Sequence, residues 1–258
     1  MRLHVVEWGD PAGRPVLCLH GVSARGNRFR RLAREIPGLR LVAPDLRGHG
    51  GSGREPPWDV DTHAADVLET ADSLGLGRCD LLGFSFGGRI AATVAATAPE
   101  RVERLVLLDP ALRVTPEQAL EFAERDRGVT SFASAEEGVD AELEAGVLFR
   151  TPRALVEEEM REDWVRRPDG RVEYHWLPSA VVTAWSEMAR EPPSVADLPT
   201  LIVVADRSYI GVDVERYRAA LGDRLTVVTV PGGHSVMWEA VEQTGAAVRP
   251  FLQRGLTP

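Results

Sequence analysis

The run Asp80-Leu81-Leu82-Gly83-Phe84-Ser85-Phe86-Gly87-Gly88 joins a short apolar segment to a helix-forming one, and the architecture can be worked out from this junction. The apolar residues 79–83 predict a buried strand, and residues 89–98 predict a helix directly after the glycines. A sharp strand-to-helix turn holds a serine in a strained backbone conformation. It needs glycines two positions away on either side, because side chains there would clash. Such a turn lifts the Ser85 hydroxyl clear of the sheet, so Ser85 is a candidate nucleophile.

Other short apolar runs lie on both sides of this junction and alternate with helix-forming segments. They predict strands at 3–8, 15–19, 39–43, 105–108, 200–205 and 225–230, with a closing helix at 239–252. Continuous apolar strands separated by helices indicate an α/β fold, in which helices cover both faces of a mostly parallel, doubly wound sheet. Ligands bind such sheets at the carboxyl ends of the strands, so polar residues that follow these ends should meet at one edge.

The alternation of strands and helices stops between Asp109 and Leu198. Acidic, helix-favouring stretches follow one another there without a convincing buried strand, at 116–127, 134–149 and 151–164. We interpret residues 111–195 as an inserted helical cap, which leaves residues 1–110 and 196–258 as the core. Residues 111–195 contain 18 acidic residues and 10 arginines, so they carry most of the formal charge of −9.

The composition excludes several classes of function. With 44% hydrophobic and 27% charged residues, the 258-residue chain has the balance of a soluble globular protein, and its apolar runs are too short to span a membrane. The first residues lack the apolar stretch of a signal peptide, which predicts a cytoplasmic location. All 30 basic residues are arginine, which excludes chemistry that needs a lysine amine, and no basic stripe is present for nucleic acid. Cys18 and Cys79 lie in apolar runs and are expected to be small buried side chains, and neither a metal nor an organic cofactor is expected.

A serine hydroxyl needs a base to accept its proton before it can attack a substrate. His234 follows two glycines, just past the last predicted strand and before the closing helix. Because that loop lies on the same sheet edge as Ser85, His234 is the candidate general base. His4 and His63 are expected to face solvent. His175 is expected to pack or to contact substrate rather than to carry chemistry.

Four motifs follow the predicted strand ends in order. They are His20-Gly21, then Asp45-Leu46-Arg47-Gly48-His49-Gly50 with Ser52, then the serine turn, and finally Gly233-His234. On these motifs the chain resembles the α/β-hydrolases over nearly its whole length, and it is similar to serine esterases and lipase-like hydrolases with a helical cap. One predicted strand precedes the His-Gly motif, where the family usually has two, so the sheet is expected to be one strand shorter.

The resemblance implies roles for the backbone beside two of these motifs. In the family, one oxyanion-hole amide comes from the residue after His-Gly, here Val22, and the second comes from the residue after the nucleophile, here Phe86. Because both donors are backbone N–H groups, the hole is formed before substrate binds. His20 is expected to hold this loop by hydrogen bonding, and residues 45–52 are expected to form a turn that supports the pocket.

The carboxylate that orients the base has two candidates. The family's commonest pattern, Gly-x-x-Asp after the penultimate strand, is altered here, because Ala205 replaces the glycine and Ser208 replaces the aspartate. Asp206 lies two residues before the usual position. Some relatives instead carry the acid after the strand that follows the nucleophile helix, and Asp109 has that position here. We take Asp109 as the first candidate and Asp206 as the alternative.

These assignments predict a serine hydrolase that uses a Ser-His-Asp triad and an acyl-enzyme to cleave a small, largely apolar carboxylic ester or lactone. In the family the cap closes over the serine and shapes the pocket. Five cap aromatics are candidates to line this pocket, although most are expected to form the cap's own core: Phe149, Trp164, Tyr174, Trp176 and Trp185.

Two other interpretations stay open at this point. Cofactor-free perhydrolysis or carbon–carbon bond hydrolysis uses the same triad and differs in pocket groups that the sequence does not locate. A ligand-binding module on an inactive hydrolase scaffold belongs to a different class of function. The unusual position of the acid favours the module, whereas Ser85, His234 and the oxyanion motifs favour an enzyme.

Overall fold

The computed structural model describes residues 1–128, 131–145, 148, 151–161 and 163–253. Its main sheet has seven strands in the order β1-β3-β2-β4-β5-β9-β10, and it confirms the predicted mostly parallel α/β architecture. Neighbouring strands run parallel except β1, which pairs with β3 in the antiparallel direction. The strands are β1 (Val5–Gly9), β2 (Arg14–Leu19), β3 (Leu39–Pro44), β4 (Cys79–Phe84), β5 (Val102–Leu108), β9 (Thr200–Ala205) and β10 (Leu225–Val230).

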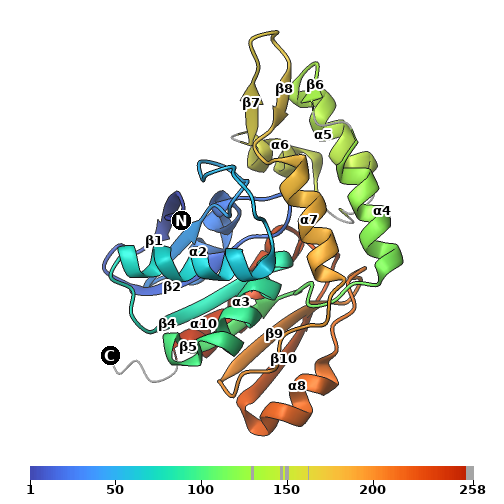
Figure 1. Ribbon diagram of the computed structural model, residues 1–258. Coiled ribbons are helices and arrows are strands. Elements are labelled where there is room, and N and C mark those ends of the chain that lie inside the picture. The colour runs from blue at the N-terminus through green and yellow to red at the C-terminus, as the bar shows by residue number, and fades with distance from the viewer. Residues whose placement is uncertain (129–130, 146–147, 149–150, 162, 254–258) are drawn as a thin grey trace.

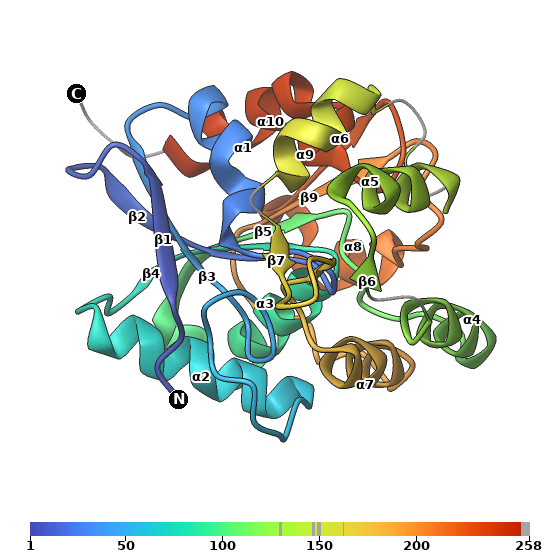
Figure 2. The same ribbon diagram turned by 90° about the horizontal axis from the view of Figure 1, so that it is seen from above.

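Helices cover both faces of this sheet, as Figure 2 shows from above. On one face lie α1 (Arg30–Glu35), α9 (Val236–Glu239) and α10 (Val241–Gln253), and on the other lie α2 (Val60–Ser73) and α3 (Phe86–Thr97). Helix α8 (Val214–Leu221) precedes β10, and short 3₁₀ turns occupy η1 (Gly26–Phe29), η2 (Pro99–Arg101) and η3 (Gly222–Arg224).

The strands read as continuous apolar runs because their alternate side chains enter two separate cores. Leu17 and Leu81 pack toward α2 and α3, whereas Val16 and Leu82 pack toward α1 and α10. Cys18 and Cys79 are buried and free, as expected.

The chain between β5 and β9 rises above the carboxyl edge of the sheet (Figure 1). Its helices are α4 (Pro116–Asp126), α5 (Ala135–Glu144), α6 (Arg153–Met160) and α7 (Pro178–Met188). It also contains a small antiparallel sheet, β6-β8-β7, which the sequence did not predict: β6 (Ser131–Phe132), β7 (Trp164–Arg166) and β8 (Val172–Tyr174). These strands have only two or three residues, and β7 and β8 each contain a charged residue, so none of them forms an apolar run that would predict a strand. The division of the chain into core and cap stays a prediction.

None of the helices in the described ranges combines the length and apolar character needed to cross a membrane.

Candidate active site

Ser85 occupies a sharp turn between β4 and α3. Its backbone φ of 53° lies in the left-handed region, which is strained for a residue with a side chain. A Cβ on Gly83 would lie 2.3 Å from the carbonyl oxygen of Gly87, and a Cβ on Gly87 would lie 2.1 Å from that of Leu19. These clashes are the physical reason for the two glycines. The Ser85 N–H donates to the Leu108 carbonyl at 3.1 Å, which ties the turn to the neighbouring strand.

His234 lies in the loop between β10 and α9, and its ring bridges Ser85 and Asp109. Its Nε2 lies 2.8 Å from Ser85 Oγ, and its Nδ1 lies 2.6 Å from Asp109 Oδ2. All three side chains are buried. The loops after β4, β5 and β10 therefore bring these three residues together at one sheet edge, as the parallel topology requires.

Asp109 is held in place by the strand β9 beside it. Its backbone has a φ of 37°, and its N–H donates to the Val203 carbonyl at 2.7 Å. The Ala205 N–H donates to Asp109 Oδ1 at 2.9 Å, and the Ser208 hydroxyl donates to Oδ2. Sequence reasoning missed the part played by Ser208, although its place at the family's usual acid position was a signal: its hydroxyl holds the Asp109 carboxylate.

Asp206, the alternative acid, has a different environment. It is exposed, and its Oδ1 accepts a hydrogen bond from the Gly232 N–H at 2.8 Å. Asp206 thus shapes the loop that carries His234 and makes no recorded contact with the ring within the described residues.

The two predicted oxyanion amides flank the serine turn. A Cβ on Gly21 would lie 3.2 Å from Ser85 Cβ, so the loop that contains Val22 packs directly on Ser85. Phe86 is the first residue of α3, where an amide N–H has no acceptor inside the helix. Across the described ranges, neither the Val22 nor the Phe86 N–H donates to a backbone carbonyl outside a helix or strand.

His20 ties the oxyanion loop to the loop after β3. Its Nδ1 donates to the Gly21 carbonyl at 2.8 Å, and its Nε2 accepts from the Leu46 N–H at 2.8 Å. Burial lowers the pKa of His20 well below its usual value, so the ring stays neutral and can both donate and accept. This is the structural role expected for His20.

Two more buried imidazoles hold the same loop. His49 Nε2 contacts the Val22 carbonyl, and His175 Nε2 lies 3.1 Å from the Ala24 carbonyl. Burial lowers the pKa of His49 to about 4. The Val22 and Ala24 carbonyls therefore point toward the two histidines. His175 belongs to the chain between β5 and β9 and packs against this loop, which is one of the two roles expected for it.

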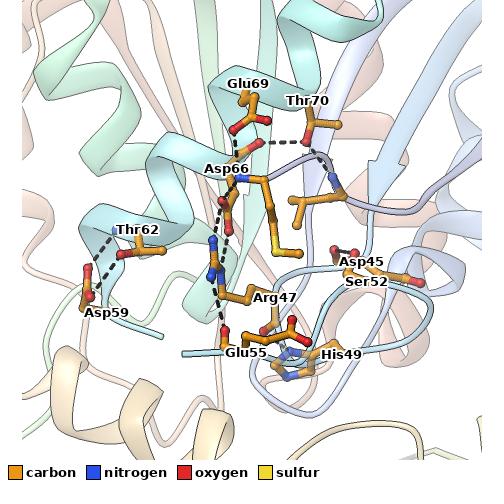
Figure 3. Close-up of polar contacts among 12 residues, drawn as sticks. Asp45, Arg47, His49, Ser52, Glu55, Asp59, Thr62, Asp66, Glu69 and Thr70 are labelled. Carbon is orange, nitrogen blue, oxygen red and sulfur yellow. Dashed lines mark hydrogen bonds and ion pairs between the residues drawn. The ribbon is translucent and has the colours of Figure 1, made fainter. Parts of the chain in front are cut away.

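The turn formed by residues 45–52 is held by polar contacts, several of which Figure 3 shows. Asp45 accepts hydrogen bonds from the Gly26 and Gly51 N–H groups at 2.8 and 2.9 Å. Arg47 reaches across to α2 and donates to both carboxylate oxygens of Asp66, at 2.7 and 2.8 Å. The turn is therefore anchored to both the core and a helix, as expected.

His63, on α2, was expected to face solvent, and this prediction was wrong. The residue is 1% exposed, and its ring packs edge-on against Phe86 with the ring centroids 5.5 Å apart. It shares the inward helix face with Val60 and Val67, a three- and four-residue spacing that was visible in the sequence. In the described part of the chain, neither ring nitrogen has a hydrogen-bond partner, and burial lowers the pKa of His63 to about 3. His4 is exposed, as expected.

A cavity of about 260 Å³ opens above Ser85 and His234. Of the five aromatic candidates, three line it: Tyr174, Trp176 and Trp185. Trp164 packs against Phe132 and Tyr174 instead, with centroid separations of 5.7 and 5.1 Å, and Phe149 lies outside the described residues. Four more aromatic residues, which sequence analysis did not single out for the cavity, complete the wall: Phe84, Phe132, Tyr209 and Trp238.

The cavity also has charged groups in its wall, which the largely apolar substrate predicted from sequence does not lead one to expect. Five charged side chains line it: Arg28, Arg125, Asp126, Glu142 and Asp163. They are scattered along the chain without a motif, so only the fold reveals them. The described residues contain no group of three or more His, Cys, Asp or Glu side chains placed to hold a metal ion.

Residues 14–241 match the family model described as alpha/beta hydrolase fold. The chain belongs to the α/β-hydrolase family. This α/β-hydrolase is 32% identical to the lipase LipV of Mycobacterium tuberculosis over 97% of both chains. It is 28% identical to a putative 2-succinyl-6-hydroxy-2,4-cyclohexadiene-1-carboxylate synthase of Bacillus subtilis, over 98% of this chain and 95% of the relative.

Solved structures share the fold of this α/β-hydrolase. An E-2-(acetamidomethylene)succinate hydrolase superposes with a TM-score of 0.81 at 24% identity, covering 97% of this chain and 95% of the other. The enol-lactonase from Burkholderia xenovorans superposes with a TM-score of 0.80 at 18% identity, covering 98% and 96%.

Proposed function

We propose that this α/β-hydrolase is a serine hydrolase that cleaves carboxylic esters or lactones through an acyl-enzyme. Ser85 is the nucleophile, His234 the general base and Asp109 the acid. The observation that carries the proposal is the hydrogen-bonded relay from Ser85 Oγ through both His234 nitrogens to Asp109, at 2.8 and 2.6 Å. Full-length similarity to a lipase supports the same reaction type.

Acylation begins when Ser85 Oγ attacks the carbonyl carbon of the substrate while its proton passes to His234 Nε2. Asp109 accepts the Nδ1–H bond and stabilises the imidazolium that forms. The Val22 and Phe86 amides donate to the carbonyl oxygen as it becomes negative, and removing one such donor typically costs about 3 kcal/mol of transition-state stabilisation. The imidazolium then gives its proton to the departing alkoxide, which leaves an acyl group on Ser85.

Deacylation reverses these proton transfers with water as the nucleophile. His234 accepts a proton from a water molecule, whose oxygen attacks the acyl carbonyl within the same oxyanion hole. The proton then returns to Ser85 Oγ as the carboxylic acid is released. The cavity of about 260 Å³ has room for a small acyl or alcohol group beside the reacting carbonyl.

The alternatives kept open by the sequence gain no specific support. Perhydrolysis and carbon–carbon bond hydrolysis use the same triad, and no observation favours either. The inert ligand-binding module rested on the unusual acid position, and the contact between Asp109 and His234 removes that argument.

A fluorophosphonate probe tests the proposal, because it reacts with an activated serine. We expect the labelled peptide to contain Ser85 and not Ser23 or Ser235, which line the same cavity. Labelling should disappear in Ser85→Ala. A folded wild-type protein that takes up no probe at Ser85 would contradict the mechanism.

A further inference from the structure

Arg28 brings a positive charge into the same cavity as the nucleophile. It lies in η1, just after the oxyanion loop, and its guanidinium Cζ lies 3.7 Å from the centroid of the Trp238 ring. Trp238 comes from α9, four residues past His234. Both residues line the cavity that contains Ser85. Two segments that flank the proposed triad thus build one aromatic-backed cationic site.

The carboxylates around the cavity already have donors. Asp126 accepts from the Trp185 indole N–H at 2.7 Å and from Arg125 at 2.6 Å. Glu142 accepts from the Tyr174 hydroxyl at 2.8 Å, and burial raises the pKa of Glu142.

Asp163 is likewise paired, because it accepts from Arg25 Nε at 2.6 Å. Arg28 differs from all of these groups. Within the described ranges its guanidinium makes no hydrogen bond or ion pair, and its side-chain contact is with the face of Trp238. Removal from water lowers the pKa of Arg28, while Asp163, Glu159 and Glu142 act in the opposite direction without bonding to it. The guanidinium of Arg28 thus lines the cavity with N–H donors that have no hydrogen-bond partner among the described residues, and these donors can bind the oxygens of a ligand.

The chemistry of this site selects a carboxylate. A guanidinium that stacks on an aromatic face leaves its N–H edges available, and these edges match the two oxygens of a carboxylate. The surrounding acidic residues, Asp163 and Glu142 among them, favour a ligand with one negative charge over a phosphate dianion, since a second charge would be repelled.

We propose that Arg28 binds a carboxylate of the substrate, so that the hydrolase acts on esters or lactones that carry a free carboxylate away from the bond that is cleaved. The inference rests on the proposed role of Ser85 and replaces the largely apolar substrate predicted from sequence. Arg28 then orients the substrate in the cavity and makes no contact with the reacting atoms.

Matched esters test this substrate class. The acidic substrates are the monomethyl esters of succinic, glutaric and adipic acids, and each has a neutral counterpart in which an amide replaces the free carboxylate. For the best-fitting length, we expect wild-type kcat/KM to be at least about tenfold higher for the acid, because a buried donor site rejects an analogue that leaves it poorly paired. Arg28→Gln should bring this ratio close to one, and Arg28→Lys, which keeps the charge without the fork, should give an intermediate ratio.

Arg34→Gln is the charge-matched control, because Arg34 is an exposed arginine on α1 outside the cavity lining. It should keep the wild-type ratio. Equal rates for acid and amide in the wild type, or an unchanged preference in Arg28→Gln, would overturn the proposal.

Binding separates this inference from the proposed reaction. Titration calorimetry with hexanoate and hexanamide reports on the Arg28 site without turnover, and circular dichroism checks that each variant is folded. We expect wild-type protein, but not Arg28→Gln, to bind hexanoate at least about tenfold more tightly than hexanamide. Equal binding of the two compounds refutes the carboxylate site. Failure of the fluorophosphonate to label Ser85 refutes the hydrolase instead.

Discussion

The loops at the carboxyl edge of the main sheet and the described residues between 111 and 195 form opposite walls of one cavity, but the two walls are built differently. The sheet loops are fixed through their backbones: Ser85 donates to β5, and Asp109 donates to β9. The opposite wall combines backbone pairing, in β6-β8-β7 and in a bridge between Trp176 and His49, with aromatic stacking, as of Tyr174 on Trp176 with centroids 4.6 Å apart. Because aromatic side chains form much of the wall between 111 and 195, we expect substitutions there to alter the fit of a ligand more than the position of Ser85.

The largest effect is expected from removing the Ser85 hydroxyl, which lies in the wall formed by the loops of the main sheet. Ser85→Ala should lower kcat for a 4-nitrophenyl ester by at least about 10⁴-fold, because the hydroxyl forms the covalent intermediate. Steady-state hydrolysis measures the loss, and thermal unfolding should show that the variant is folded. Retention of a tenth of the wild-type rate would mean that this wall does not carry the chemistry.

The two candidate acids, Asp109 in the loop after β5 and Asp206 in the loop after β9, provide the next test. Asp109→Asn should lower kcat by around 10⁴-fold, because an amide cannot fix the required imidazole tautomer or stabilise its cation. Asp206→Asn is the matched control and should stay within about threefold, since Asp206 bonds to Gly232 and not to the ring. If both variants stay within threefold, Asp109 is not the acid.

A change in the opposite wall should alter substrate fit while leaving the nucleophile active. Trp176→Leu enlarges the cavity, so we expect the preference among 4-nitrophenyl esters to move to longer acyl chains, with changes of about tenfold in kcat/KM. The rate of Ser85 labelling by a small fluorophosphonate should change much less. A loss of labelling as large as that of turnover would show that the two walls are not separable.

The smallest expected effect concerns stability at acid pH. His49 and His63 have pKa values of about 4 and about 3 in the folded protein, so between these values and about 6.5 the unfolded chain binds more protons. The free energy of unfolding should therefore decrease as the pH falls from about 6.5 to about 4.

Replacing His63 tests this directly, because its buried ring packs against the Phe86 ring and has no hydrogen-bond partner among the residues that the structure describes. His63→Leu should change the free energy of unfolding by no more than about 1 kcal/mol at pH 7 and should weaken its decline toward pH 4. Urea titrations at both pH values measure the two effects. An identical decline in wild type and variant would exclude His63 as a contributor.

The sequence predicted the sheet wall well because its signals are local. Apolar runs located all seven strands, and the glycines around Ser85 are required by contacts within a few residues or with the adjoining strand. The parallel topology then placed His234 on the same edge. His63 was within reach of the same reasoning, since its spacing from Val60 and Val67 already put it on the buried helix face.

The order of strand, turn and helix was thus determined by the amino-acid sequence alone, because steric limits on the backbone and the burial of apolar runs act over short distances. Only the tertiary structure decided that the Asp109 side chain, and not that of Asp206, meets the imidazole. The direction of this side chain depends on the left-handed backbone of Asp109 and on hydrogen bonds from the Ala205 N–H and the Ser208 hydroxyl. It also decided that Arg28 and Trp238 share a cavity, since residues so far apart in the chain become neighbours only after the whole molecule has folded.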